Sequence, residues 1–288
     1  MNLLLFINWS FDAEIIPGYR TPNWYGLLFV SGMILGYFVI RKMFKQENIS
    51  NELLDKLVMY MVPATVIGAR LGHVFFYGPY WGPEGYFSNP IEIVKIWEGG
   101  LASHGAAVVI LLALWYFSNK VIHKPYLWML DRIAAPIAIA GAFIRLGNLV
   151  NHEMVGYVTD VPWGFRFLHH DCMNLIDGQY LCDWAEIPVR HPANLYESLA
   201  YFLSFGILML LFWRKQAWKK QGLVFGTFLV LIFGFRFLIE FLKESQTDND
   251  SIVDISTGLN TGQWLSVPLV LAGIILIIRA RKKSFEEA

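Results

Sequence analysis

The sequence contains little charge. Of its 288 residues, 16% are Asp, Glu, Lys or Arg, and the formal net charge is zero. A soluble globular domain carries roughly 25% charged residues. The deficit, together with 56% hydrophobic residues and a mean hydropathy of +0.44, excludes an ordinary soluble domain and indicates a membrane protein. Because no basic excess is present, we expect no nucleic-acid partner.

Cysteine is also scarce. Only Cys172 and Cys182 occur, both in one polar segment, and no paired histidines stand at the spacing of a zinc site. The sequence therefore offers no credible ligand set for a metal ion, and we expect no cofactor. The two cysteines either form a disulfide, if their loop is extracytoplasmic, or remain free thiols. Both alternatives stay open on the sequence.

Two other features are missing. The N-terminus has no basic region followed by a small-residue cleavage site, so no removable signal peptide is expected. No internal repeat is found, which weakly disfavours many transporter folds, because these are commonly built from two related halves.

Seven apolar stretches are each long enough to cross a bilayer, which takes about 20 helical residues. They are residues 23–43, 56–77, 100–119, 128–150, 196–213, 222–242 and 263–281. The sequence thus predicts an all-α polytopic membrane protein with about seven transmembrane helices. We expect residues 1–288 to form a single integral membrane domain.

The basic residues predict the orientation. Fifteen lysines and arginines flank the ends of the spans that would face the cytoplasm, and five lie on the opposite side. The five are Arg20, Lys95, Arg166, Arg190 and Lys243. Because cytoplasmic loops carry the basic excess, the N-terminus is predicted outside and the C-terminus in the cytoplasm. Residues 151–195 then form an extracytoplasmic loop or head segment.

Three arginines, Arg70, Arg145 and Arg236, each interrupt a long apolar stretch that otherwise predicts a membrane span. An arginine near the centre of a membrane helix costs about 2.5–3.5 kcal/mol on insertion scales. Such a residue is retained where it faces partners, water or an anionic ligand. Since no comparable excess of acids accompanies them, the arginines predict a site for a phosphate or carboxylate within the membrane.

Two of these arginines have polar neighbours at helical spacing. Arg145 and Asn148 share a helix face, and a guanidinium with a carboxamide suits phosphate or ester oxygens. The alternative is a polar helix terminus from which Arg145 reaches the interface. Arg236 and Glu240 are spaced to form an intrahelical ion pair. That pair is either structural, or Glu240 holds Arg236 in place for an anionic ligand.

A histidine and the third arginine complete the candidates. His104 follows Gly99-Gly100-Leu-Ala-Ser, and an imidazole there can take a proton from a nucleophile or bond a carbonyl in a tight turn. Arg70 is either a ligand contact or a structural partner for a carboxylate such as Glu98 or Glu153. Asp131 is expected to be structural. The run 190–197 (RHPANLYE) is interpreted mainly as the entry and cap of the fifth span.

Taken together, these segments resemble the prolipoprotein diacylglyceryl transferase family of bacterial inner-membrane enzymes. The matching segments run in the family's order from residue 24 to 241. They are Trp24-Tyr25-Gly26, residues 68–72 (GARLG), residues 99–105 (GGLASHG), Arg145-Leu-Gly147-Asn148 with Asn151 and Glu153, Pro162-Trp163-Gly164, His191-Pro192 with Leu195-Tyr196-Glu197, and Arg236 with Glu240-Phe241.

The chain departs from the family pattern at several positions. The family usually has an aromatic residue and a glycine where Ser103 and Ala106 flank the histidine. It has glycines in place of Ile144 and His152, and a tyrosine in place of Ile232. The cysteine-containing part of residues 165–187 does not align.

The resemblance implies an activity and a set of site residues. Members transfer the diacylglyceryl group of phosphatidylglycerol to the lipobox cysteine in the signal peptide of a prolipoprotein, forming a thioether and releasing glycerol phosphate. It implies a multi-pass protein of the bacterial inner (cytoplasmic) membrane whose active site faces the extracytoplasmic side. The implied catalytic residues are His104, Arg145 and Arg236. The implied substrate contacts are Tyr25, Asn148, Glu153, Glu240, Arg70 and Gly156.

The chemistry suits these residue types. A thiol with an ordinary pKa near 8.5 attacks faster once a base such as His104 removes its proton. Guanidinium groups stabilise the charge that grows on a leaving phosphate. A rival hypothesis is a transporter or flippase for an anionic lipid or solute, which would need polar residues through the full membrane depth. An intramembrane metalloprotease is disfavoured, because the chain lacks an HExxH motif.

Overall fold

The structure, a computed structural model, describes residues 6–16, 18–81, 85–96, 100, 102–173, 175–176, 179–244 and 258–286. In these residues seven helical segments are long and apolar enough to cross a membrane, which confirms the predicted helical fold with seven spans. The chain is a multi-pass membrane protein. The spanning elements are α1 (Trp24–Gln46), α2 (Asn51–Phe76), α4 (Ser103–Tyr116) continued by the π-helix η2 (Phe117–Ile122), α5 (Tyr126–Val150), α7 (Ala193–Arg214), α8 (Leu223–Ile239) continued by the 3-10 turn η4 (Glu240–Leu242), and α10 (Thr261–Glu286).

The observed bounds lie close to the predicted ones. The largest differences are five residues: α10 extends to Glu286 rather than ending at residue 281, and α2 begins at Asn51 rather than at residue 56. Its first turn contains Asn51, Glu52 and Asp55. These residues fall outside any apolar window, yet Asn and Asp near a helix start are favourable, and Glu52 suits the positive end of the helix dipole.

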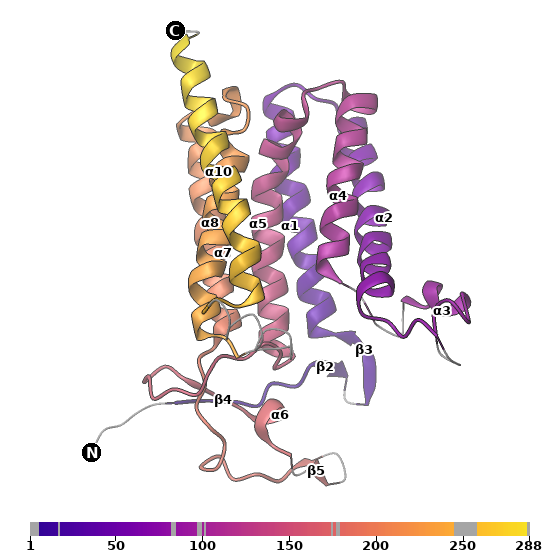
Figure 1. Cartoon of the computed structure of the whole chain (residues 1–288), viewed down its shortest axis with the longest axis vertical. Helices are drawn as coiled ribbons and strands as arrows, with labels where there is room; N and C mark the ends of the chain where they lie inside the picture. Colours follow the sequence, from indigo (N-terminus) through magenta and orange to yellow (C-terminus); the bar gives the residue numbers. More distant parts are fainter. Residues whose placement is uncertain are drawn as a thin grey trace. The chain divides into compact units, whose positions relative to one another are not determined.

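The chain divides into two compact units. The first comprises residues 1–39 and 131–288, and the second comprises residues 40–130. In the second unit, α2 and α4 lie side by side (Figure 1). Glycines make this possible, since a Cβ on Gly105 would lie 2.4 Å from the carbonyl oxygen of Gly68. The glycines around Arg70 and His104 thus allow two helix backbones to touch.

In the first unit, α7, α8 and α10 stand next to one another (Figure 1). Ser198 of α7 donates a hydrogen bond to the carbonyl of Ala142 in α5 at 3.0 Å. Asp131, near the start of α5, accepts from the backbone N–H groups of Gly222 and Phe225 at 2.7 and 2.8 Å. Asp131 therefore caps the backbone N–H groups at the N-terminal end of α8, which is a structural role, as expected.

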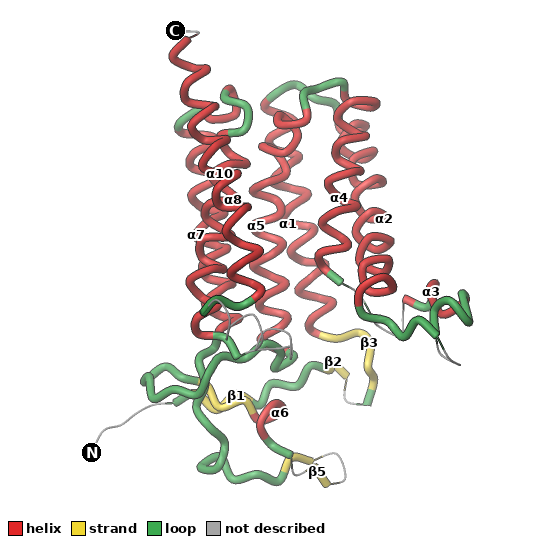
Figure 2. The backbone as a smooth tube through the Cα atoms, in the orientation of Figure 1, coloured by secondary structure: helices red, strands yellow, loops and turns green. Residues whose placement is uncertain are grey.

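Short strands gather at one end of this unit, where α1 begins and α5 ends; we call it the strand end (Figure 2). β1 (Ile7–Trp9) pairs in parallel with β4 (Phe165–Phe167), in the register Ile7 to Phe165. β2 (Glu14–Ile16) pairs with β3 (Tyr19–Asn23), and β5 (Leu175–Ile176) pairs with β6 (Gln179–Tyr180), both antiparallel. The sequence predicted none of these strands, because two to five residues are too few to show an alternating pattern.

A disulfide and a small hydrophobic cluster stabilise the strand end. Cys172 and Cys182 are bonded, which decides between the two alternatives left open by the sequence. The indole of Trp9 donates to the carbonyl of Leu149 at 3.0 Å and so attaches β1 to the end of α5. Leu149, Val155, Phe165 and Phe167 form a buried hydrophobic cluster beneath it.

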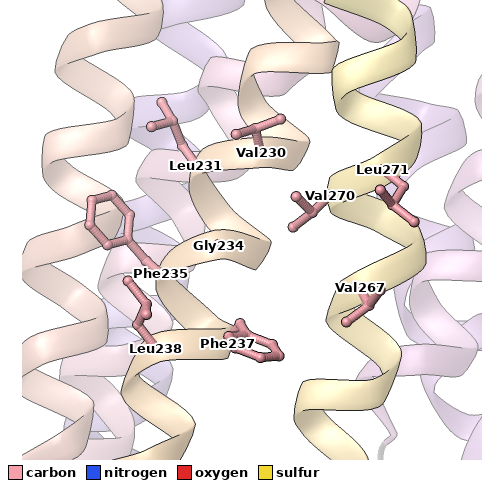
Figure 3. Close-up of a pocket in the computed structure, with 9 residues that line it drawn as sticks. All are labelled: Val230, Leu231, Gly234, Phe235, Phe237, Leu238, Val267, Val270 and Leu271. Carbon is pink, nitrogen blue, oxygen red and sulfur yellow. The ribbon is translucent and has the colours of Figure 1, made fainter.

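A shallow apolar groove of about 480 Å³ runs between α8 and α10. Phe237 of α8 and Val270 of α10 point into the space between the two helices (Figure 3). The side chain of Gln263 spans the helix pair near the strand end by donating to the carbonyl of Phe237 at 3.3 Å. The groove is lined entirely by apolar residues and glycine, so it suits hydrocarbon rather than a charged group.

Candidate functional site

Arg145 lies in the next-to-last turn of α5, close to the strand end. Its Nε is 2.8 Å from Oε2 of Glu197 in the first turns of α7. The side chain of Arg145 is 15% exposed, and that of Glu197 is fully buried. The structure therefore gives Arg145 a carboxylate partner from another helix, which the sequence had not predicted.

The second carboxylate oxygen of Glu197 is held by a lysine. Nζ of Lys243 lies 2.8 Å from Oε1 of Glu197 and 3.5 Å from Oε2 of Glu240. Lys243 directly follows η4, the turn that ends α8, and is buried. Glu240, which was predicted to be spaced for an ion pair with Arg236, instead has Lys243 as its partner. The 3-10 turn that begins at Glu240 brings Lys243, three residues later, beside this carboxylate, while the N–H of Glu240 still donates to the carbonyl of Arg236 as in an α-helix.

Arg236 borders the same group of charges. It lies within electrostatic range of the carboxylate of Glu197 and of the phenol of Tyr201. Its Nε is buried and has no hydrogen-bond partner among the described residues. We call Arg145, Arg236, Lys243, Glu197 and Glu240 the charge cluster. Three cations face two carboxylates, so the cluster has one excess positive charge and suits an anionic ligand.

Asn148 joins the charge cluster to a polar corner at the end of α5. Its Oδ1 accepts from Nη1 of Arg145 at 3.4 Å, and its Nδ2 donates to Oε2 of Glu153 at 2.7 Å. Asn151 donates to Oε1 of Glu153 at 3.0 Å, and the side chain of Asn194 donates to the carbonyl of Glu153. The shared face of Arg145 and Asn148 predicted from their spacing is thus present.

Two tyrosines complete the surroundings of Arg145. The ring of Tyr25 packs on the end of α5, where a Cβ on Gly147 would lie 2.7 Å from its Cδ2. Tyr25 also lies within electrostatic range of Glu153 and Arg145. Tyr201, a buried residue of α7, lies within electrostatic range of the guanidinium of Arg145. Tyr25 was predicted to belong to the site, whereas Tyr201 was not.

Gly156 lies where three segments meet at the strand end. Its N–H donates to the carbonyl of His191 at 3.0 Å. A Cβ at this position would lie 2.6 Å from the carbonyl oxygens of both His191 and Leu242. Only a glycine lets these backbones approach so closely. Gly156 therefore places the segment that leads into Lys243 against the segment that leads into α7.

The sequence reasoning missed Glu197, Lys243 and Tyr201. Glu197 was assigned with its neighbours to helix entry and capping, and that interpretation was wrong for its side chain, which joins two cations. A signal was available, because Glu197 is the only charged residue between Ala193 and Arg214. Lys243 was noted only as one of five basic residues on the less basic side. Tyr201 gave no signal within an apolar, aromatic-rich span.

Arg70 and His104 belong to the second unit. Arg70 is buried and donates from Nε to the carbonyl of Ile93 at 2.8 Å, from Nη1 to that of Gly100 at 3.1 Å, and from Nη2 to that of Glu92. It therefore fastens the segment around α3 (Ile91–Val94) to α2. Glu98, one of its predicted carboxylate partners, lies outside the described residues.

His104 lies in the first turn of α4 and is exposed. Its ring meets that of Phe76 edge to face at 5.1 Å and is tilted against that of Tyr77 at 5.5 Å. His104 therefore lies at an exposed position of the second unit, beside two aromatic rings.

Comparison with known proteins decides the family. The family described as prolipoprotein diacylglyceryl transferase matches residues 16–279. The chain belongs to this family. It is 43% identical over 285 residues to the phosphatidylglycerol–prolipoprotein diacylglyceryl transferase of Porphyromonas gingivalis, covering 98% of this chain and 97% of the relative. The proteins of the same name from Tolumonas auensis and Chloroherpeton thalassium are 42% and 39% identical, covering 96% and 99% of this chain and 98% of each relative.

His152, where the family pattern has glycine, adopts a left-handed backbone with φ of 56°. Glycine adopts this conformation freely, whereas other residues adopt it rarely. The ring of His152 stacks on that of His169 at 4.4 Å, and His169 stacks on Tyr180 at 4.5 Å. Nε2 of His152 bonds the carbonyl of Phe11 at 3.0 Å. His152, the residue before Glu153, therefore anchors both the N-terminal segment and the disulfide loop.

This histidine predicts acid sensitivity. Burial lowers the pKa of His152 to about 4, so an unfolded chain binds a proton between the ordinary value of 6.5 and pH 4 that the folded chain does not bind. Stability should therefore fall as the pH falls, by about 2 kcal/mol between pH 7 and pH 5. The measurement is the unfolding temperature in detergent at both pH values. His152→Asn, which tolerates the left-handed backbone, should show a smaller decrease; an equal decrease in both proteins would contradict the assignment.

Proposed function

We propose that the protein transfers the diacylglyceryl group of phosphatidylglycerol to the lipobox cysteine thiol of a prolipoprotein. The reaction forms a thioether and releases glycerol phosphate. Membership of the family and the names of the relatives support this activity. The observation that carries it is the charge cluster, whose excess positive charge lies near the strand end of α5, α7 and α8.

The leaving group explains the cations. The cysteine sulfur attacks the terminal glycerol carbon of the diacylglyceryl group, the sulfur–carbon bond forms, and the carbon–oxygen bond to phosphate breaks. The departing phosphate ester keeps the electron pair, so negative charge grows on its oxygen. Arg145 and Arg236 stabilise this charge, and preorganised groups of this kind contribute several kcal/mol in a site with little water. The unpartnered Nε of Arg236 is available to donate to the phosphate.

The surrounding residues hold these cations and the headgroup in place. Glu197, itself paired with Lys243, holds Arg145, and Asn148 accepts a hydrogen bond from the same guanidinium. Tyr25, Glu153 and Glu240 contribute polar groups to substrate binding. Gly156 contributes through the close backbone packing that it allows between the segments leading into Lys243 and α7. Arg70 is proposed as a further substrate contact because of its place in the family motif. Its hydrogen bonds to three carbonyls give it a structural role in addition.

His104 is proposed as the base that removes the thiol proton. His104→Gln should lower the transfer rate at pH 7 by about 10²-fold or more, the usual contribution of a general base. The remaining rate should rise with pH toward 8.5, because the substrate thiol then ionises without help. His123→Gln, which changes another exposed histidine of the same unit, is the matched control. Parental activity of the His104 variant at pH 7 would remove the residue from the mechanism.

The protein is proposed to lie in the bacterial inner membrane with the charge cluster toward the extracytoplasmic side. Two observations support this orientation. The basic residues concentrate at the opposite ends of the spans, as is typical of cytoplasmic loops. The disulfide between Cys172 and Cys182 lies at the strand end, and such bonds persist in oxidising compartments.

The deciding experiment supplies purified protein with phosphatidylglycerol and a lipobox peptide. A transferase adds a diacylglyceryl mass to the peptide cysteine and releases glycerol phosphate in equal amount. A peptide with serine in place of the cysteine is the control and should gain no mass. A flippase or transporter of an anionic lipid, the rival hypothesis, would move lipid between leaflets of a vesicle and leave the peptide unchanged. Family membership does not favour that rival.

A further inference from the structure

Backbone hydrogen bonds at the strand end hold the segment that carries Lys243. The N–H of Tyr157 donates to the carbonyl of Leu242 at 2.9 Å, and that of Glu244 donates to the carbonyl of Val155 at 3.2 Å. These bonds flank Lys243 on both sides. The ammonium group of Lys243 reaches Glu197 and Glu240 only while this segment keeps its place.

The side chain of Arg190 fastens the same segment from outside. Its Nε and Nη2 lie 2.9 and 2.7 Å from the two carboxylate oxygens of Asp171, and its Nη1 lies 3.0 Å from Oε2 of Glu244. The side chains of Arg190 and Asp171 are 11% and 7% exposed, and that of Glu244 is 44% exposed. Such a two-pronged contact between an arginine and a carboxylate restricts both side chains strongly.

Asp171 connects this contact to the disulfide loop. It directly precedes Cys172, which is bonded to Cys182. Burial alone would raise the pKa of Asp171, but hydrogen bonds from His170 and Arg190 outweigh it and lower the pKa. Asp171 is therefore ionised at neutral pH and presents a full charge to Arg190. A continuous path of contacts leads from the disulfide loop through Arg190 and Glu244 to Lys243.

We propose that Arg190 is a positioning residue for the charge cluster: through Glu244 it holds Lys243 between the two cluster carboxylates, and the Cys172–Cys182 disulfide keeps its Asp171 partner in place. The proposal rests on the proposed function for its effect on catalysis. Its structural part stands on the contacts alone and has a separate measurement.

That measurement is the rate at which an amine-reactive ester modifies Lys243 at pH 8.5, read by mass spectrometry of the purified full chain in detergent. Lys243 is 6% exposed and held by two carboxylates, so it should react slowly in the parent protein. Glu244→Gln, Arg190→Lys and the double variant Cys172→Ser/Cys182→Ser should each react about fivefold faster or more, because local opening becomes easier. Exposed Lys215 is the internal reference and should react equally in all of them.

Transfer kinetics form the second measurement. The three variants should raise the KM for phosphatidylglycerol roughly threefold to tenfold, an effect of the size expected for a partly exposed ion pair, with a smaller change in kcat. Combining Asp171→Asn with the cysteine substitutions should add little to either change alone, because both act on the same path. Asp12→Asn, which removes an exposed carboxylate from His169 in the same region, is the matched control and should leave both readouts unchanged.

The two readouts separate the possible failures. If the parent protein transfers no lipid, the proposed function fails, while the labelling of Lys243 still tests the positioning role. If Glu244→Gln and Arg190→Lys leave the labelling rate and the KM at parental values, the positioning role is overturned. Faster labelling with an unchanged KM would overturn the link to substrate binding. All comparisons are made below the unfolding temperature of the least stable variant.

Discussion

Replacing Arg236 with glutamine is expected to lower the rate of diacylglyceryl transfer by about 10²- to 10³-fold, the usual cost of removing one preorganised donor to a developing negative charge. The fold should be retained. Nε of Arg236 has no hydrogen-bond partner among the described residues, so the substitution breaks no hydrogen bond from this atom to them. A charged arginine within a span is itself costly, and a neutral residue there should leave the unfolding temperature unchanged or raise it.

The transfer rate and the thermal stability are measured on the same preparation. Transfer is followed with phosphatidylglycerol and a lipobox peptide, and stability is followed by thermal unfolding in detergent. Arg214→Gln removes an exposed arginine from the last turn of α7 and is the matched control for loss of one positive charge. If Arg236→Gln lost stability in proportion to activity, Arg236 would be a structural residue. If it kept the parental rate, its role at the leaving phosphate would be wrong.

The spans and their bounds followed from the sequence because the bilayer imposes them. A helix must present about 20 apolar residues to cross, and such runs are visible in any window. The π-helical end of α4 and the 3-10 end of α8 were not predictable, because they change the hydrogen-bonding step without changing the composition. The turn after Glu240 mattered most, since it places Lys243 beside that carboxylate.

The candidate site was only partly visible in the sequence, for a related reason. Arg145 and Asn148 lie three residues apart on one helix, so their contact could be read from helical spacing. The contact between Arg145 and Glu197 joins α5 to α7 across 52 positions of sequence. No local pattern records which faces of two helices meet. A buried acid within an apolar span is nevertheless a usable signal, because an unpaired charge there is too costly to keep.

Glu197 is the residue on which the charge cluster depends most. Glu197→Gln keeps the size and shape of the side chain but removes the negative charge between Arg145 and Lys243. Three cations would then face Glu240 alone. Breaking a buried ion pair by neutralising one partner typically costs about 3–5 kcal/mol. We therefore expect a large fall in the unfolding temperature, together with loss of transfer because Arg145 is no longer held.

A companion variant separates charge balance from shape. Lys243→Met removes one cation and should also destabilise, because it leaves Glu197 with one fewer partner. The double variant restores the balance, so its loss of stability should be smaller than the sum of the two single losses. Glu186→Gln, an exposed acid at the strand end, is the control and should change neither stability nor transfer. If Glu197→Gln unfolded and reacted like the parent protein, the five residues would not act as one unit. Glu197 would then be no more than the helix-entry residue that its sequence position suggests.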